Sequence, residues 1–171
     1  MRHRSFLSKG FTLVELLIVV VVLGILAGIV LPAFNSSTDD AKSSAAQQNL
    51  AAIRSAVDLY KVQHSDTFPG YPVGGGTPTD TLFVDQLSKV TKKDGTSAAL
   101  GTAGYPFGPY LKTGIPANPF NNLSTIQIIA DGAAMPTSGD DSHGWVYKPQ
   151  TGELKCDSSA TTSDGKAIYG M

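Results

Sequence analysis

The chain has 171 residues, of which only 16% are charged, and its formal net charge is -1. Once a membrane segment is set aside, this length suits one compact domain and is too short for two ordinary ones. The lysines and arginines beyond residue 10 are scattered and form no basic stripe that could neutralise phosphates, which argues against a nucleic-acid partner. The single cysteine, Cys156, cannot close an intramolecular disulfide, so the fold must be stable without one.

The first ten residues carry a concentrated positive charge. Arg2, Arg4 and Lys9 lie in this segment, which contains no acidic residue. An excess of basic residues beside an apolar segment keeps that end of a chain on the cytoplasmic side of a bilayer. We therefore expect the N-terminus to stay in the cytoplasm.

An uninterrupted apolar stretch follows. The 19 residues from Leu16 to Phe34 contain no charge, and at about 1.5 Å per residue such a helix is roughly long enough to cross the hydrocarbon core of a membrane. An ordinary secretory signal would have a shorter apolar run, of about 7–15 residues, and a cleavage site of small residues after it. Neither condition is met. No cysteine directly follows the apolar run, so a lipoprotein signal is not supported either. The sequence therefore predicts a transmembrane helix over residues 11–34.

Glu15 is the only charged residue between positions 11 and 34. An unpaired acid inside a membrane costs on the order of a few kcal/mol, so Glu15 is expected to have a partner. Taken alone, this residue could also lie at the depth of the lipid headgroups, where the helix dipole favours a carboxylate near the N-terminus.

The residues around Glu15 form a motif. The stretch GFTLVE, from Gly10 to Glu15, resembles the processing site of type IV prepilins and type II secretion pseudopilins. The resemblance implies that a prepilin peptidase/methyltransferase cuts after Gly10 and methylates Phe11, and that Glu15 pairs with the terminal amine of a neighbouring subunit during assembly. Physical chemistry agrees with that role, because cleavage would place a cationic amine at the positive end of a helix, where a carboxylate relieves the repulsion.

Three residues inside the apolar stretch favour close helix packing. Gly24, Gly28 and Pro32 recur every four residues and fall near one helical face. The glycines would let a second helix approach closely, and Pro32 should kink or loosen the helix because it removes a backbone donor. The resemblance supports an assembly role for these residues. The alternative is that Gly and Pro are simply commoner in membrane helices than in soluble ones.

The helix is expected to continue beyond the apolar stretch. One apolar stripe is formed by Ala46, Leu50, Ile53, Val57 and Tyr60, and residues 33–68 contain neither Gly nor Pro. A helix from about Phe11 to His64 would be roughly 80 Å long. The chain then has four expected regions: a cytoplasmic leader peptide (1–10), a transmembrane and assembly helix (11–34), an amphipathic continuation (35–64) and a periplasmic globular domain (65–171).

The first part of the globular domain should be mostly irregular. A loop rich in Gly and Pro runs from Thr67 to Pro78, and Asp80 could cap a short helix that reaches Val90 before the turn at Gly95. The prolines of the next segment exclude long helices and central strands, so an ordered loop packed on the domain is expected. This loop resembles the PYL-IP-NP region of major pseudopilins in Pro109, Tyr110, Leu111, Ile115, Pro116, Asn118 and Pro119.

Three strands are expected at the end of the chain, at Thr125 to Ala130, Gly144 to Lys148 and Glu153 to Cys156. The short connection between the last two predicts an antiparallel hairpin. Trp145 and Tyr147 share one strand face and should pack in a core against the second half of the helix. The sequence thus predicts an α+β fold of the type IV pilin kind, with a long N-terminal helix packed on a small C-terminal antiparallel β-sheet.

The sequence offers little sign of catalysis. The three histidines are far apart, no catalytic or phosphate-binding motif occurs, and we expect no enzyme. Oxygen-rich loops can hold calcium, and several major pseudopilins bind this ion in a C-terminal loop. The weak calcium candidates in this chain are Asp131, Asp140, Asp141 and Asp157. The alternative is that these acids are only solvated surface groups.

These patterns favour a structural filament subunit in the inner membrane, with its N-terminus in the cytoplasm and its globular domain in the periplasm. The expected partners are the prepilin peptidase/methyltransferase, further copies of the chain, other pilin-like subunits and an inner-membrane assembly platform. The proline-rich loop and the GWVY stretch favour a type II secretion pseudopilus that drives protein export. The alternatives are a type IV pilus subunit for adhesion, twitching or DNA uptake, and a membrane-tethered binding module that forms no filament.

Overall fold

The computed structural model describes residues 10–162 and 164–171, and of residues 29–37 it describes only the backbone. The predicted leader cations Arg2, Arg4 and Lys9 therefore lie outside the described residues. The chain forms two compact units, Met1–Thr38 and Asp39–Met171. Helix α1 (Leu13–Gln63) starts in the first unit and ends in the second.

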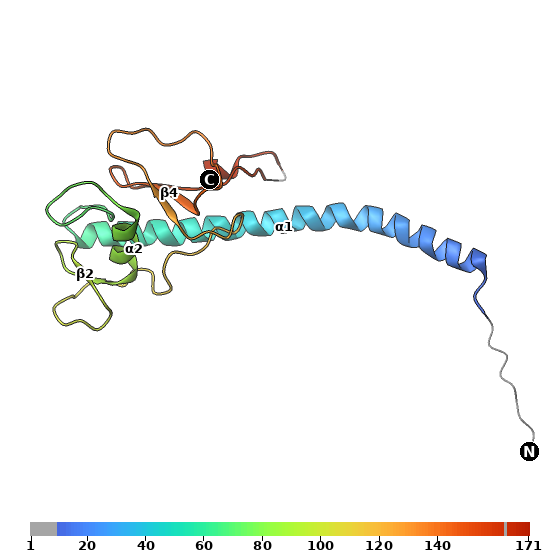
Figure 1. Cartoon of the computed structure of the whole chain (residues 1–171), viewed down its shortest axis with the longest axis horizontal. Helices are drawn as coiled ribbons and strands as arrows, with labels where there is room; N and C mark the ends of the chain where they lie inside the picture. Colours follow the sequence, from blue (N-terminus) through green and yellow to red (C-terminus); the bar gives the residue numbers. More distant parts are fainter. Residues whose placement is uncertain (1–9, 163) are drawn as a thin grey trace, which may run out of the picture. The chain divides into compact units, whose positions relative to one another are not determined.

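The second half of α1 is the spine of the folded domain. Its predicted stripe is buried, since none of the five side chains is more than 2% exposed: Ala46, Leu50, Ile53, Val57 and Tyr60. Helix α2 and strand β4 lie beside this part of α1 (Figure 1). Each large apolar side chain fully removed from water contributes roughly 1.5–3 kcal/mol to stability, so this stripe fixes the helix on the domain.

Helix α2 (Asp80–Ser88) lies where a short helix was predicted, but its cap differs. Thr79, not Asp80, is the N-cap: it has an extended backbone, and its hydroxyl accepts the N–H of Leu82 at 3.2 Å. Asp80 already lies inside the helix, and its carboxylate accepts the N–H of Thr81 instead. The prediction that Asp80 caps the helix is therefore wrong by one residue.

A two-stranded hairpin follows α2 and was not predicted. Strands β1 (Val90–Thr91) and β2 (Ser97–Ala98) pair antiparallel around the turn at Gly95, where φ is +88°. Val90 was expected on the apolar face of the helix but starts β1 instead. Two-residue strands are too short to give a periodic pattern, which explains why the sequence did not reveal them.

The main sheet contains β3 (Ile126–Ile128), β4 (Trp145–Lys148) and β5 (Glu153–Cys156) in that order. The antiparallel hairpin predicted for the last two strands is confirmed. Strand β3 instead runs parallel to β4, so the sheet is mixed and not purely antiparallel. The reason is the long connection over residues 129–144, because a chain needs about a dozen residues or more to return to the same end of a sheet. The α+β fold class is confirmed.

The core joins the sheet, both helices and the loops. Trp145 and Tyr147 are fully buried and belong to one apolar cluster with the α1 stripe, as predicted. The proline-rich loop is ordered and packs on that cluster through Tyr110, Leu111, Ile115 and Phe120. The last turn, η1 (Ile168–Gly170), was not predicted, although Ile168 and Tyr169 are buried.

Candidate functional site

The first turn of α1 is closed by a reciprocal pair of side chains. The Glu15 carboxylate accepts the backbone N–H and the hydroxyl of Thr12, both at 2.8 Å, and Thr12 Oγ1 accepts the backbone N–H of Glu15 at 3.2 Å. This arrangement is a capping box, in which two otherwise unpaired backbone donors are satisfied. The capping role of Thr12 was not predicted, although the spacing T-x-x-E is typical of a capping box.

The predicted processing residues lie next to this turn. Gly10 and Phe11 precede the helix and are exposed, with 83% of Phe11 open to solvent. The two hydrogen bonds that described residues donate to the Glu15 carboxylate both end on Oε2, and no described group bonds to Oε1. The structure therefore brings Gly10, Phe11 and Glu15 together at the start of one helix.

The surface of α1 is apolar on every side over residues 16–28. The large apolar side chains from Phe11 to Leu26 are between 48% and 85% exposed. An exposed apolar surface of this extent marks a contact with protein or membrane. Gly24 and Gly28 lie within this surface, and a Cβ at either position would meet no atom within 4 Å.

In the part of the chain that the structure describes, no helix is both long enough and apolar enough to span a membrane. The transmembrane helix over residues 11–34 stays a prediction, and the side chains of residues 29–34 lie outside the described part. The side chain of Pro32 is among them. The backbone of α1 is helical on both sides of this residue.

The second half of α1 has an uncharged face opposite its buried stripe. The positions on this face are exposed and recur every three or four residues: Ala41, Ser44, Gln48, Ala52, Ser55, Leu59 and Val62. Leu59 is 50% exposed and Val62 is 80% exposed. A surface helix normally carries charged residues opposite its apolar stripe. On this helix, charges such as Arg54 and Asp58 lie between the two faces.

The acidic residues weighed as calcium ligands have protein partners. Asp157 is buried, and its carboxylate accepts the N–H groups of Asp140 and His143, each at 2.8 Å. Hydrogen bonds from the hydroxyl and from the backbone N–H of Ser142 hold the pKa of Asp140 below its usual range. The carboxylate of Asp141 accepts the hydroxyl and the N–H of Ser159.

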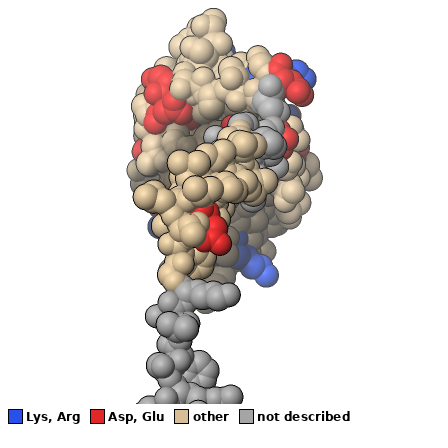
Figure 2. Space-filling view, turned by 90° about the vertical axis from the view of Figure 1, so that its right-hand side faces the viewer, with Lys and Arg blue, Asp and Glu red and all other residues tan. Residues whose placement is uncertain are grey.

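Asp131 lies elsewhere, where it accepts the hydroxyl of Tyr71 at 2.7 Å. Within residues 10–162 and 164–171, no three His, Cys, Asp or Glu side chains are grouped so that they could hold a metal ion. On the face drawn in Figure 2, the acidic side chains form several separate patches. Calcium binding therefore stays a prediction, and Asp131 is not joined by hydrogen bonds to the other three acids.

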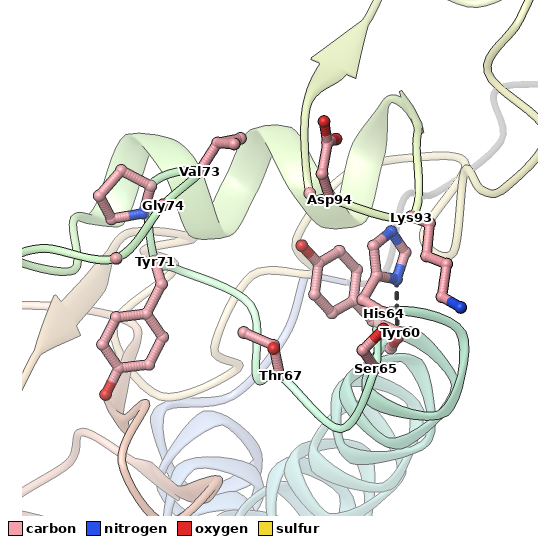
Figure 3. A pocket seen from close by; sticks show the side chains of 12 residues that line it. Tyr60, His64, Ser65, Thr67, Tyr71, Val73, Gly74, Lys93 and Asp94 are labelled. Carbon is pink, nitrogen blue, oxygen red and sulfur yellow. Dashed lines mark hydrogen bonds between the residues drawn. The ribbon is translucent and has the colours of Figure 1, made fainter.

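A cavity of about 410 Å³ lies where α1 ends, between the loop after the helix and the turn before Gly95 (Figure 3). The His64 ring stacks on Tyr60 at 3.7 Å, and its Nδ1 lies 2.7 Å from the carbonyl oxygen of Tyr60. A carbonyl can only accept, so Nδ1 carries the proton and Nε2 accepts the hydroxyl of Thr91 at 2.9 Å. Both rings are almost fully buried, so this stack holds two loops on the helix and offers little surface to a ligand.

The chain combines a helix whose first half is apolar and exposed with a small domain that packs on its second half. Residues 6–31 match the family model described as the prokaryotic N-terminal methylation motif. Core protein G of the type II secretion system of Pseudomonas aeruginosa is 47% identical over 57 residues, which cover 33% of this chain and 40% of that protein. The matched part is similarly short in several other curated relatives, at about half of their length.

Longer matches define the family. The type IV narrow pilus major component PilA5 of Thermus thermophilus is 40% identical over 79 residues, covering 43% of this chain and 68% of that protein. Core protein G of Aeromonas hydrophila is 32% identical over 115 residues, covering 67% of this chain and 69% of that protein. The chain therefore belongs to the family of type IV pilins and type II secretion pseudopilins. No solved structure matches it.

Proposed function

We propose that the chain is made as a precursor and becomes the structural subunit of a type IV pilus-like filament. A prepilin peptidase/methyltransferase would cut after Gly10 and methylate Phe11. Residues 11–34 would anchor the chain in the inner membrane, with the N-terminus in the cytoplasm and the folded domain in the periplasm. The match of residues 6–31 to the methylation motif supports this proposal, as does the basic segment before Gly10.

The observation that carries the proposal is the uncovered apolar surface from Phe11 to Leu26. Before assembly, lipid would cover this surface, and after assembly the helices of other copies would cover it. The open positions at Gly24 and Gly28 would allow close helix contact, because glycine lets two backbones approach. The assignment of Pro32 to the same contact rests on its spacing and on the resemblance to type IV prepilins, because its side chain lies outside the described residues.

Glu15 would act both in the precursor and in the assembled filament. In the precursor its carboxylate caps the first turn of α1 through Thr12. Cleavage converts the backbone nitrogen of Phe11 from an amide into a cationic amine at the positive end of the helix. Oε1 of Glu15, to which no described group bonds, could then accept that amine from a neighbouring copy, which would set the axial position of the incoming subunit.

The uncharged face from Ala41 to Val62 would add to the contact between subunits. It differs from the apolar surface at Phe11 to Leu26, so each copy would carry two unlike surfaces. Contacts between unlike surfaces propagate from copy to copy and give open helical filaments when the rotation does not close. The face would thus favour a filament over a closed dimer.

Among filaments of this family, we propose a type II secretion pseudopilus that drives protein export, assembled on an inner-membrane platform together with other pilin-like subunits. Two relatives described above are named as core protein G of that system. A type IV pilus subunit for adhesion, twitching or DNA uptake is the second candidate. It is favoured by the match to the narrow pilus component, of which the aligned region covers 68%.

The precursor is tested by the intact mass of the chain from membranes that contain the peptidase. The expected product begins at methylated Phe11, and the Gly10→Ala variant should keep its full length. A full-length wild-type chain, or cleavage after residue 30, would contradict the proposal.

The filament is tested by sedimentation of sheared filaments from cells that make the processed chain. Glu15→Ala should be cleaved yet fail to sediment, and Leu59→Glu should reduce the yield by placing a charge on the uncharged face. Ala99→Glu adds the same charge at an exposed loop position and is the matched control. If Glu15→Ala sediments like the wild type, Glu15 has no role in assembly. If the processed wild-type chain does not sediment, the chain is better explained as a tethered binding module that forms no filament.

A further inference from the structure

The loop over residues 118–124 contains three asparagines, two of which are built into the domain. Asn118 is fully buried, and its Nδ2 donates to the carbonyl oxygens of Gly144 and Asp157, each at 3.0 Å. Asn121 Nδ2 donates to the carbonyl oxygens of His143, at 2.7 Å, and Asp157, at 3.1 Å. These two side chains tie the loop to the residues that come directly before β4 and directly after β5.

Asn122 differs from both. Its backbone N–H donates to the carbonyl oxygen of Asn118 at 2.8 Å, and its φ of 59° is a left-handed conformation that asparagine tolerates better than most residues. The residue is exposed, and among the described residues its side-chain amide has no hydrogen-bond partner. The turn therefore presents a free carboxamide to solvent.

The residues after Asn122 complete an acceptor motif. Asn122, Leu123 and Ser124 read N-x-S with a residue other than proline in the middle, which is the pattern of N-glycosylation acceptors on surface loops of exported proteins. Ser124 is also exposed, and no described group bonds to its hydroxyl. The same pattern at Asn35 to Ser37 lies inside α1, and its side chains are outside the described residues.

We propose that Asn122 is the acceptor of an N-linked glycan. Nδ2 would attack the anomeric carbon of a sugar carried on a polyisoprenyl diphosphate. The bond between that carbon and the diphosphate oxygen breaks, the lipid diphosphate leaves with the electron pair, and Nδ2 gives up one proton to the transferase. The inference rests on the proposed function in one respect, because the domain must reach the outer side of the inner membrane, where it would meet such a donor.

The test is mass spectrometry of the chain isolated from the cells that make it. The tryptic peptide that contains Asn122 should be heavier by whole sugar residues, and enzymatic removal of the glycan in ¹⁸O-labelled water should leave a labelled aspartate at this position. Asn122→Gln and Ser124→Ala should both abolish the added mass. Ser124→Thr keeps the motif at the same exposed position and should keep the glycan.

The N-terminus, read in the same sample, separates this inference from the proposed function. An unmodified peptide in a chain that begins at methylated Phe11 overturns the glycan alone. A glycan at Asn122 in a chain that keeps its leader supports the inference and contradicts the processing step. Sugar that persists in both Asn122→Gln and Ser124→Ala overturns the assignment to this residue.

Discussion

The two halves of α1 share one helical backbone but differ in how far their apolar side chains are buried. From Phe11 to Leu26 every large apolar side chain is at least 48% exposed, whereas the stripe from Ala46 to Tyr60 is at most 2% exposed. Folding of the domain therefore buries one face of the second half of the helix, whereas the apolar side chains of the first half are exposed. We infer that the stability of the domain and the association of the chain depend on different residues.

The largest expected effect comes from removing the centre of the domain. Trp145 is fully buried against the α1 stripe, and its Nε1 donates to the carbonyl oxygen of Pro116 at 2.8 Å. Trp145→Ala should lower the free energy of unfolding by about 3–5 kcal/mol because it leaves a cavity. Urea denaturation of the full chain in detergent, followed by circular dichroism, measures this change.

The control for this variant lies in the other half of the helix. Val22 is 48% exposed in the isolated chain, so Val22→Ala should change domain unfolding by less than about 0.5 kcal/mol. Cys156 gives a second readout, since burial raises the pKa of its thiol to about 12 and keeps it protonated and shielded. The thiol should react with an alkylating reagent faster in Trp145→Ala and at an unchanged rate in Val22→Ala. Equal destabilisation by both variants would contradict the separation of the two halves.

The next effect concerns the loop that joins the proline-rich segment to the sheet. Asn118→Ala would remove the hydrogen bonds to the carbonyl oxygens of Gly144 and Asp157, and it would leave the N–H of Phe120 without its acceptor. The two carbonyl oxygens keep other donors, the N–H of Asp157 and Nδ2 of Asn121. Since each lost hydrogen bond costs about 0.5–1.5 kcal/mol, we expect a loss of about 2–3 kcal/mol in the free energy of unfolding. Ser124→Ala, at an exposed position of the same loop, is the matched control and should have almost no effect in the same denaturation assay.

The stability of the domain should depend on pH through His64, whose side chain is neutral in the folded state. Burial lowers the pKa of His64 from 6.5, so around that pH the unfolded chain binds a proton that the folded domain does not. The stability contributed by neutral His64 is therefore complete above pH 6.5 and is lost as the pH falls toward the pKa of the folded state.

Urea denaturation at about pH 7.5 and about pH 5.5 tests this prediction across the range where histidine titrates. The wild-type domain should be less stable at the lower pH, and His64→Gln should show a smaller difference between the two conditions. An identical difference in both proteins would mean that His64 is not the group responsible.

The same contrast explains what the sequence could predict. Long periodic or uninterrupted patterns were sufficient for α1 and its buried stripe, and the strands β4 and β5 followed from their apolar residues and short connection. The parallel pairing of β3 depends on where a long loop returns to the sheet, which no local pattern indicates. The strands β1 and β2 are too short to give a periodic pattern. The stack of His64 on Tyr60 could be expected from their i, i+4 spacing, whereas the bond to Thr91 joins residues 27 positions apart.

At the candidate site, the motif from Gly10 to Glu15 was visible because all its residues are neighbours in sequence. The capping role of Thr12 was visible in principle, since T-x-x-E is a local signal. The calcium candidates came from composition alone. Most of their carboxylate oxygens bond to nearby N–H and hydroxyl groups, a result of loop folding that composition cannot reveal.

The smallest effect tests the corrected start of α2. Thr79→Ala removes the hydroxyl that accepts the N–H of Leu82 and should cost about 1 kcal/mol, whereas Thr79→Ser keeps that bond and should cost much less. Asp80→Ala loses only a first-turn charge and a local bond, worth roughly 0.5 kcal/mol. A larger effect of Asp80→Ala than of Thr79→Ala would restore Asp80 as the cap. Because α2 belongs to the folded domain, whereas the surface proposed for assembly belongs to α1, none of these variants should change the sedimentation of filaments.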